Sequence, residues 1–147
     1  MGVLDTIGAH FADAYKQTLT DSAHAFGAPD FIIEATGHSP NAWEAANALN
    51  ANGVVCLLSV TSGGQKAEIE SDLINQSLVL GNRIIFGSVN QHRIDFEQGV
   101  RDMLAIGRLW PGLLERFIVR RLPIEQTRVA LETKDPSRLK TVIEIAG

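Results

Sequence analysis

Three short apolar runs recur along the chain, and each ends in small or polar residues. They cover residues 30–37, 53–60 and 83–90. Runs of this kind are typical of buried parallel strands whose carboxyl ends line a ligand crevice. We therefore expect the three strands to lie side by side in one sheet, with their ends converging on one extended ligand.

The segment between the first two runs has the signals of a helix. Ser39 and Pro40 form a helix start, residues 42–49 make an alanine-rich body, and Asn52 with Gly53 ends the pattern. Strand, helix and strand in this order predict a right-handed crossover unit. With the third run added, the pattern is that of half a nucleotide-binding domain.

The remaining segments predict further elements. Before the first run, we predict a weak strand over residues 10–14 and a helix within residues 15–29. Between the second and third runs, we predict a short edge strand over residues 68–70 and a helix that is capped by Ser71 or Asp72 and runs through Leu80. Past residue 90 the apolar positions recur at helical spacing, which predicts an amphipathic helix that packs on another surface. A helix over residues 124–131 and a strand over residues 139–145 complete the chain.

Length and composition then narrow the class of protein. The chain has 147 residues, of which 45% are hydrophobic, which suits one domain with a sizeable core. Its apolar runs are far shorter than the roughly 18 residues of a membrane span. The amino terminus lacks the basic and apolar regions of a secretory signal. We therefore expect a cytoplasmic protein with no membrane partner.

Charge and cysteine usage exclude two kinds of site. The formal net charge is −4, and the only basic cluster is Arg120 with Arg121, so a nucleic acid partner is not expected. That pair is interpreted as solvated or salt-bridged, with phosphate recognition as the alternative. The single Cys56 rules out an internal disulfide and a multi-cysteine zinc site. Its place inside an apolar run predicts a buried rather than a reactive thiol.

Four polar side chains near the ends of the runs are candidates for chemistry. Glu34 is either a general base or a hydrogen-bonded structural carboxylate, and a buried strand end favours the second. His38 and His92 have no Cys or acidic partner at ligand spacing, so surface or core histidines are expected rather than metal ligands. Asn90 is equally suited to capping a turn and to contacting a ligand.

The pattern as a whole resembles the carboxy-terminal part of the zinc-dependent medium-chain dehydrogenases, and most of all the archaeal-type glucose 1-dehydrogenases. The resemblance begins at about Leu4 and covers nearly the whole chain. The first two runs are shared by many medium-chain enzymes. Leu122-Pro123-Ile124, Ala130-Leu131 and residues 140–145 also belong to the pattern. The segments that point more narrowly to the glucose dehydrogenase branch are Gly-Ser-Val-Asn at residues 87–90 and the stretch 110–123.

The resemblance implies an α/β fold. The expected architecture is a partial Rossmann domain, a doubly wound parallel sheet that lacks its first strands, plus a carboxy-terminal α+β segment of the catalytic domain. Residues 1–92 would form the second half of the dinucleotide-binding domain. Residues 93–147 would form the segment that returns to the catalytic domain.

The resemblance also implies a set of cofactor contacts. In that family the ends of the second and third runs border the nicotinamide half of NAD(P), and the end of the first run lies along the ribose. The expected cofactor-binding residues are Ala35, Thr36, Gly37, Leu58, Ser59, Val60, Ser88, Val89 and Asn90. Asn90 is also the expected contact to the sugar substrate, and no catalytic residue or metal ligand is expected in this chain.

The chain departs from the family on its amino-terminal side. It contains no Gly-x-Gly-x-x-Gly turn, and the family's zinc ligands would lie in an amino-terminal domain outside this chain. We therefore expect a fragment or one part of a split protein, with the residue that selects NAD or NADP also outside it. Without the first strands, residues 31–35 become an exposed apolar edge, which predicts a homo-oligomer, poor solubility or pairing with a complementary amino-terminal part.

Two functions remain as hypotheses. The first is a glucose or aldose 1-dehydrogenase, which transfers a hydride from the anomeric carbon of the sugar to NAD(P), with this chain as the cofactor-side half. The second is a catalytically inactive oligomerisation or binding module derived from the same fold. We expect no measurable turnover from the chain alone, because it supplies only part of the cofactor site.

Overall fold

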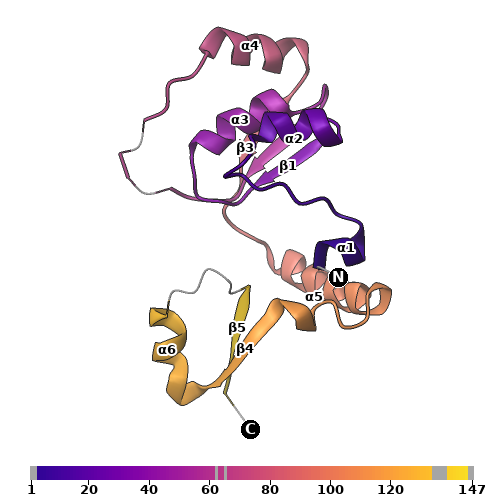
Figure 1. Ribbon diagram of the computed structural model, residues 1–147, viewed down its shortest axis with the longest axis vertical. Coiled ribbons are helices and arrows are strands. Elements are labelled where there is room, and N and C mark those ends of the chain that lie inside the picture. Colours follow the sequence, from indigo (N-terminus) through magenta and orange to yellow (C-terminus); the bar gives the residue numbers. More distant parts are fainter. Residues whose placement is uncertain (1–2, 62, 65, 134–138, 146–147) are drawn as a thin grey trace. The chain divides into compact units, whose positions relative to one another are not determined.

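The chain folds into two compact units in a computed structural model that describes residues 3–61, 63–64, 66–133 and 139–145. One unit is Ala12–Asn90, here called the three-stranded unit, and the other is Met1–Phe11 with Gln91–Gly147, called the two-stranded unit. Figure 1 shows the elements in chain order. Over the described ranges, no helix is long and apolar enough to cross a membrane.

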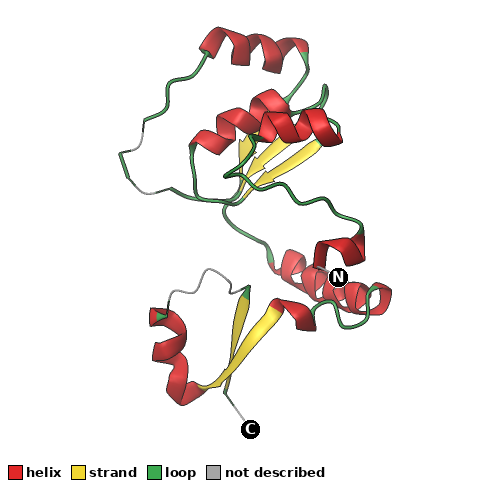
Figure 2. Cartoon of the chain, viewed as in Figure 1, coloured by secondary structure: helices red, strands yellow, loops and turns green. Residues whose placement is uncertain are grey.

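A parallel sheet forms the centre of the three-stranded unit. Its strands are β1 (Phe31–Glu34), β2 (Val54–Leu57) and β3 (Ile84–Gly87), drawn among the yellow arrows of Figure 2. They pair in the order β1-β2-β3. Both pairings are parallel and in register, so that the first residues of the three strands stand side by side. The prediction of three parallel strands side by side in one sheet is confirmed.

Three helices accompany this sheet: α2 (Leu19–Phe26), α3 (Pro40–Ala48) and α4 (Ser71–Leu80). The core lies between α3 and one face of the sheet, because the small Ala45 side chain allows a close approach and Leu49 and Val55 fill the space. Leu49 and Val55 are 1% and 0% exposed. The half-buried side chains packed around this core are Leu19, Ile32, Leu57 and Ile85.

The opposite face of the sheet is apolar and exposed. Side chains alternate between faces along a strand, and the register places Phe31 and Ile33 of β1 on the same face as Ile84 and Phe86 of β3. These four side chains are 56%, 57%, 55% and 44% exposed. They surround Cys56, which is free and buried as predicted. We call this surface the open sheet face.

The edge at β1 is open as well. Val54 N donates to Asp30 O, and Leu58 N donates to Glu34 O. The even-numbered residues of β1 therefore face β2, and the backbone groups of Phe31 and Ile33 face away from the sheet. The exposed apolar edge predicted for this strand is confirmed.

The two-stranded unit contains a second parallel pair. Strands β4 (Ile118–Pro123) and β5 (Lys140–Glu144) pair with a register shift near Ile118. Leu113 and Leu122 are buried here, and Arg116 Nη1 donates to Thr6 Oγ1 at 2.9 Å. The remaining elements are α1 (Val3–Ile7), α5 (Arg93–Leu109), the 3₁₀ turns η1 (Glu115–Phe117) and η2 (Ile124–Gln126), and α6 (Thr127–Glu132).

Some sequence-based predictions were wrong in detail. Residues 10–14 form no strand, because Asp13 instead accepts from Tyr15 N at 3.0 Å in a local turn. Residues 68–70 are irregular rather than an edge strand. The helix expected within residues 15–29 is limited to α2, which begins after the Thr18 capping box and ends at Gly27, whose φ is 96°.

The helix through Leu80 has the predicted bounds but not the predicted cap. Glu70 occupies the N-cap position and makes no side-chain capping bond, so neither Ser71 nor Asp72 caps α4. Strand β4 was not predicted at all, because Arg120 and Arg121 interrupt the apolar pattern that marks a strand. The α/β class with parallel sheets is confirmed.

Candidate functional site

The candidate site is the carboxyl edge of the three-stranded sheet. Backbone bonds continue the register beyond the strands, with Leu58 N donating to Glu34 O at 2.8 Å and Ser88 N donating to Leu57 O at 3.0 Å. The ends of the strands therefore emerge next to each other. The structure brings together all nine residues predicted for a cofactor, namely Ala35, Thr36 and Gly37 after β1, Leu58, Ser59 and Val60 after β2, and Ser88, Val89 and Asn90 after β3.

Eight of these nine residues are exposed, and Ser59 is half-buried. An edge made of exposed backbone and small side chains suits an extended ligand that lies across several strands. Gly37 has φ = 74°, a left-handed conformation that favours glycine, so the chain turns sharply after β1. That turn allows the first strand end to fold back over Glu34.

Glu34 is the buried polar residue of this edge and links the first two strand ends. It is 7% exposed. Its Oε1 accepts from Thr36 N at 2.8 Å and from the Thr36 hydroxyl, and its Oε2 accepts from the Ser59 hydroxyl. The interpretation of Glu34 as a hydrogen-bonded structural carboxylate is confirmed.

The first turn of α3 extends the same network. Asn41 Nδ2 donates to Thr36 Oγ1 at 3.0 Å, and His38 N donates to the same oxygen at 3.2 Å. We call Glu34, Thr36, Ser59 and Asn41 the Glu34 network. The sequence analysis did not connect Ser59 or Asn41 to Glu34. The available signal was that a buried carboxylate needs hydrogen-bond donors from outside its own strand.

The hydrogen bonds also set the charge state of Glu34. Burial raises the pKa of Glu34, but bonds from the Ser59 and Thr36 hydroxyls and from the backbone N–H groups of Thr36 and Gly37 outweigh it. The net result is a pKa below the ordinary value for a glutamate. Glu34 is therefore ionised near neutral pH and accepts hydrogen bonds without donating any.

This shift predicts a pH-dependent contribution to stability. A carboxyl whose pKa is lowered in the folded state stabilises the fold above its unfolded pKa of about 4.3, and the effect is lost as pH falls through the folded pKa. We expect Glu34→Gln to lower the free energy of unfolding by about 1–3 kcal/mol at pH 7. The difference from the unsubstituted chain should shrink below about pH 4.

Urea unfolding followed by circular dichroism at pH 7 and pH 3.5 measures this difference. Glu68→Gln is the matched control, because Glu68 is exposed, and it should leave stability unchanged at both pH values. A difference between Glu34→Gln and the unsubstituted chain that is the same at both pH values would contradict an ionised Glu34.

A pocket of about 330 Å³ lies beside the Glu34 network. Its walls come from β1 and the Thr36 that follows it, from α3, and from α2 with the segment before it, and they include Ile33, Glu34 and Asn41. Glu44 also lines it and is already engaged, because its Oε1 accepts from Leu19 N at 2.7 Å. The pocket therefore extends the candidate site toward the open edge of β1.

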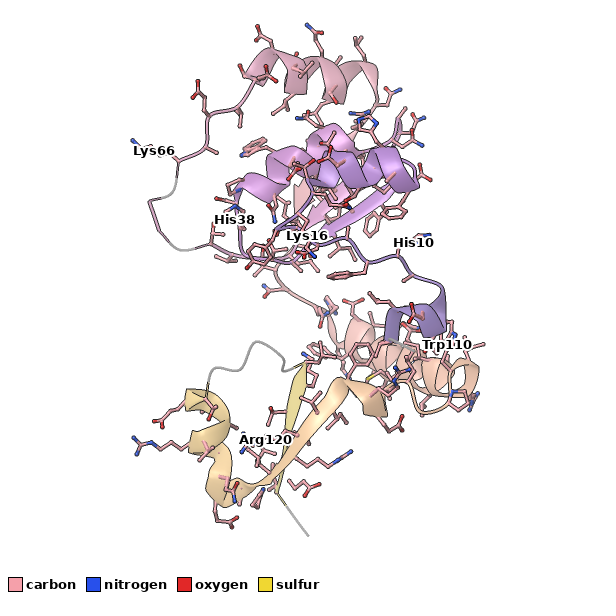
Figure 3. The ribbon with its side chains drawn as sticks, viewed as in Figure 1. His10, Lys16, His38, Lys66, Trp110 and Arg120 are labelled. Atoms are coloured by element: carbon pink, nitrogen blue, oxygen red, sulfur yellow. The ribbon has the colours of Figure 1, made fainter. Side chains whose placement is uncertain are left out.

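The two histidines noted in the sequence each precede a helix. His38 is exposed and lies just before α3 (Figure 3), and His92 lies at the start of α5, with its backbone N–H donating to Asp95 Oδ2 at 2.7 Å. Among the described residues, His, Cys, Asp and Glu side chains do not gather in groups of three or more. Elsewhere, Arg121 pairs with Glu144 at 3.5 Å, which fits the salt-bridged interpretation of the arginine pair.

Comparison with known proteins gives one consistent family. The family described as "Glucose dehydrogenase C-terminus" matches residues 1–145. Glucose 1-dehydrogenase of Methanocella arvoryzae is 33% identical over 145 residues, which is 99% of this chain and 40% of that protein. The enzyme of the same name from Metallosphaera sedula is 34% identical over 126 residues, or 86% of this chain and 35% of that protein.

Solved structures show the same relation. Glucose dehydrogenase from Haloferax mediterranei, 28% identical, superimposes with a TM-score of 0.87 over 97% of this chain and 39% of its own. The same enzyme in complex with NADP, Zn and gluconolactone has a TM-score of 0.86 over 98% of this chain and 39% of its own. The chain thus spans about 40% of the length of the relatives it matches.

Proposed function

This chain belongs to the glucose dehydrogenase C-terminus family, and on that premise we propose that it supplies the cofactor-side half of a glucose 1-dehydrogenase. The reaction would transfer a hydride from the anomeric carbon of glucose or a related aldose to NAD(P). In this proposal residues 1–92 are the second half of the dinucleotide-binding domain, and residues 93–147 return to the catalytic domain. The observation that carries the proposal is the register of the three strand ends at one sheet edge.

The edge fits the cofactor that the family implies. We assign the ends of β2 and β3 to the nicotinamide half of NAD(P) and the end of β1 to its ribose, since small side chains and a glycine turn permit close backbone approach. Bound NAD(P) would supply the hydride acceptor. The residues of this chain would hold and orient it, and Asn90 would offer both a donor and an acceptor to sugar hydroxyls.

Zinc does not fit the described residues in the same way. The Haloferax mediterranei relative was solved with Zn as well as NADP and gluconolactone. The part of this chain that the structure describes contains no group of three or more potential His, Cys, Asp or Glu ligands. We therefore derive no step through a metal held by this chain, and any metal ligands would come from a complementary part.

The partners follow from the same proposal. We expect a small sugar substrate, a second copy or a complementary amino-terminal part, and a cytoplasmic location. The alternative, an inactive oligomerisation or binding module, is favoured by one observation, the open sheet face with its four exposed apolar side chains. Catalytic complementation separates the two.

The test is a chimera with the Methanocella arvoryzae relative. Residues 1–145 of this chain would replace the 40% of that protein to which they align. We expect the chimera to reduce NAD⁺ or NADP⁺ in the presence of glucose. The isolated 147-residue chain, and the relative truncated without a replacement, should show no turnover. A folded chimera that binds neither cofactor nor glucose would instead support the inactive module.

A further inference from the structure

We infer that the three-stranded unit carries a pocket for a small organic ammonium ion, formed by the Trp43 ring and the carboxylates of Glu68 and Glu70. The pocket has a volume of about 270 Å³ and lies between α3, α4 and the segment that precedes α4. We call it the Trp43 pocket. The inference goes beyond the proposed function, because none of the nine residues proposed for the cofactor lines this pocket.

The apolar wall of the Trp43 pocket comes from one face of α3. Pro40, Trp43 and Asn47 recur at helical spacing, and all three line the pocket. Ile74 of α4 completes this wall and is 6% exposed, whereas Trp43 is 40% exposed. A tryptophan that is only partly covered presents a large aromatic surface to a ligand.

The segment before α4 supplies negative charge. Residues 67–70 all line the pocket, and Glu68 and Glu70 are exposed. Neither carboxylate is paired with a basic side chain over the described ranges of the chain. Glu70 occupies the N-cap position of α4 but makes no capping bond, so its side chain is not committed to the helix. Lys66, the nearest basic residue in the sequence, does not line the pocket, and its side chain points away from the helices (Figure 3).

Two further features act on the charge of the pocket. Glu44 of α3 also lines it and adds a third carboxylate, whose Oε1 accepts from Leu19 N at 2.7 Å. The first turn of α4 carries partial positive charge, which Asp72 in that turn offsets. The lining residues include no basic side chain, so the pocket has a surplus of negative charge that attracts cations.

This arrangement suits an organic cation better than a metal ion. A metal ion needs several oxygen ligands within about 2.6 Å of one point. His, Cys, Asp and Glu side chains do not gather in groups of three or more in the part of the chain that the structure describes. An alkylated ammonium ion instead has an apolar body that can lie on the Trp43 ring, and tryptophan is the strongest aromatic partner of such cations. The dispersed carboxylates then stabilise its charge from the rim.

A matched pair of small probes tests the inference on the full 147-residue chain. The probes are choline and dimethylbutanol, its neutral isostere, in which a carbon atom replaces the nitrogen. Each would be titrated at low ionic strength into ¹⁵N-labelled protein, which has two tryptophan indole N–H signals. We expect choline to shift the Trp43 signal saturably and to bind at least about fivefold more tightly than the neutral probe. The Trp110 signal should not move.

Two variants test the ring and the charge separately. Trp43→Leu keeps an apolar wall but removes the aromatic face, so choline binding, followed by the backbone amide signals before α4, should weaken by about two- to fivefold. Glu68→Gln combined with Glu70→Gln removes the charge and should bring the affinities of the two probes to within about twofold. Glu115→Gln combined with Glu125→Gln is the matched control. Both residues are exposed in the two-stranded unit, and their loss changes the net charge by the same two units, so the affinity ratio should be unchanged.

Each remaining outcome decides against the inference or narrows the test. Equal affinity of the unsubstituted chain for choline and the neutral probe would overturn it, because the pocket would then be merely apolar. The same loss of selectivity in the control pair would overturn it as well, since the cause would be the net charge of the chain. Tighter binding of an acetylated lysine amide than of choline would assign the pocket to a side chain of a protein partner instead. If the amide spectrum of Trp43→Leu shows an unfolded protein, the Glu68 and Glu70 pair decides.

Discussion

Replacing Leu49 with alanine should destabilise the three-stranded unit by about 2–5 kcal/mol, which is a large share of the total stability of a domain of this size. Leu49 is 1% exposed and lies in the core cluster with Ala45 and Val55. Its packing leaves little space, because a Cβ built on Gly53 would come within 2.6 Å of Leu49 Cγ. The substitution would leave a cavity between α3 and the sheet that alanine and valine side chains are too short to fill.

A matched leucine provides the control. Leu80 in α4 is 80% exposed, so Leu80→Ala should change the free energy of unfolding by less than about 0.5 kcal/mol. Urea unfolding of both variants, followed by circular dichroism, measures the difference. Similar midpoints for Leu49→Ala and Leu80→Ala would show that the core is not where the structure places it.

Loss of this core should also disturb the structure of the candidate site. The register of β1, β2 and β3 holds the strand ends next to each other, and Val55 is the side chain at the centre of that sheet. Leu49→Ala should therefore broaden the amide signals of Ser59 and Ser88 in addition to lowering stability. The network around Glu34 depends on the same register, because Glu34 and Ser59 are 25 residues apart in the chain.

The sheet could be predicted from sequence because its pattern is local. Each strand is a short apolar run that ends in small polar residues, and the helix signals around Pro40 are specific to a first helical turn. Parallel pairing follows from the long connections between runs. The nine candidate contacts came from the family resemblance applied to these strand ends, and their contact with a cofactor remains a prediction.

The Glu34 network could not be predicted in the same way. Its bonds join β1 to the end of β2 and to the first turn of α3, so they depend on the final register and on side-chain orientation. A sequence shows that a buried carboxylate needs donors, but not which residues supply them. The Thr36 hydroxyl is an example, because it donates to Glu34 and accepts from Asn41 Nδ2 and His38 N.

In the two-stranded unit, the sequence pattern predicted one element and missed another. Helix α5 was predicted from its periodicity, yet Phe96 and Val100 remain 63% and 60% exposed. Strand β4 was missed because half-buried Arg120 occupies a position where the alternating pattern calls for an apolar side chain. The periodicity of the sequence therefore identified the apolar surface of a helix. Strand β4 instead depends on its pairing with β5, which is distant in sequence and leaves no local pattern.

Replacing Ile33 with lysine should convert the chain from a self-associating to a monomeric protein. Ile33 lies on the open sheet face, is 57% exposed, and belongs to the edge strand β1, whose outward backbone groups are available for pairing. An exposed apolar edge of this kind is a template for association, and a lysine on the edge is a common natural protection against it. The unsubstituted chain should therefore form dimers or larger species at micromolar concentrations.

The expected effect follows from the apolar area that the contact buries. Loss of one buried isoleucine, together with the cost of burying a lysine charge, should weaken self-association by roughly ten- to hundredfold. Sedimentation equilibrium over a range of protein concentrations measures this change. Circular dichroism of the same samples verifies that the sheet is still formed, which is expected because the Ile33 side chain lies opposite the α3 core.

Leu80→Lys separates the role of the open sheet face from a general effect of charge. It makes the protein less negative by the same one unit, and its 80% exposed position in α4 lies outside the open sheet face, so self-association should be unchanged. Equal effects of the two lysines would indicate that charge, not the sheet face, controls association. A monodisperse unsubstituted monomer would mean that the open sheet face does not drive pairing, and the case for a complementary part that covers it would lose its physical basis.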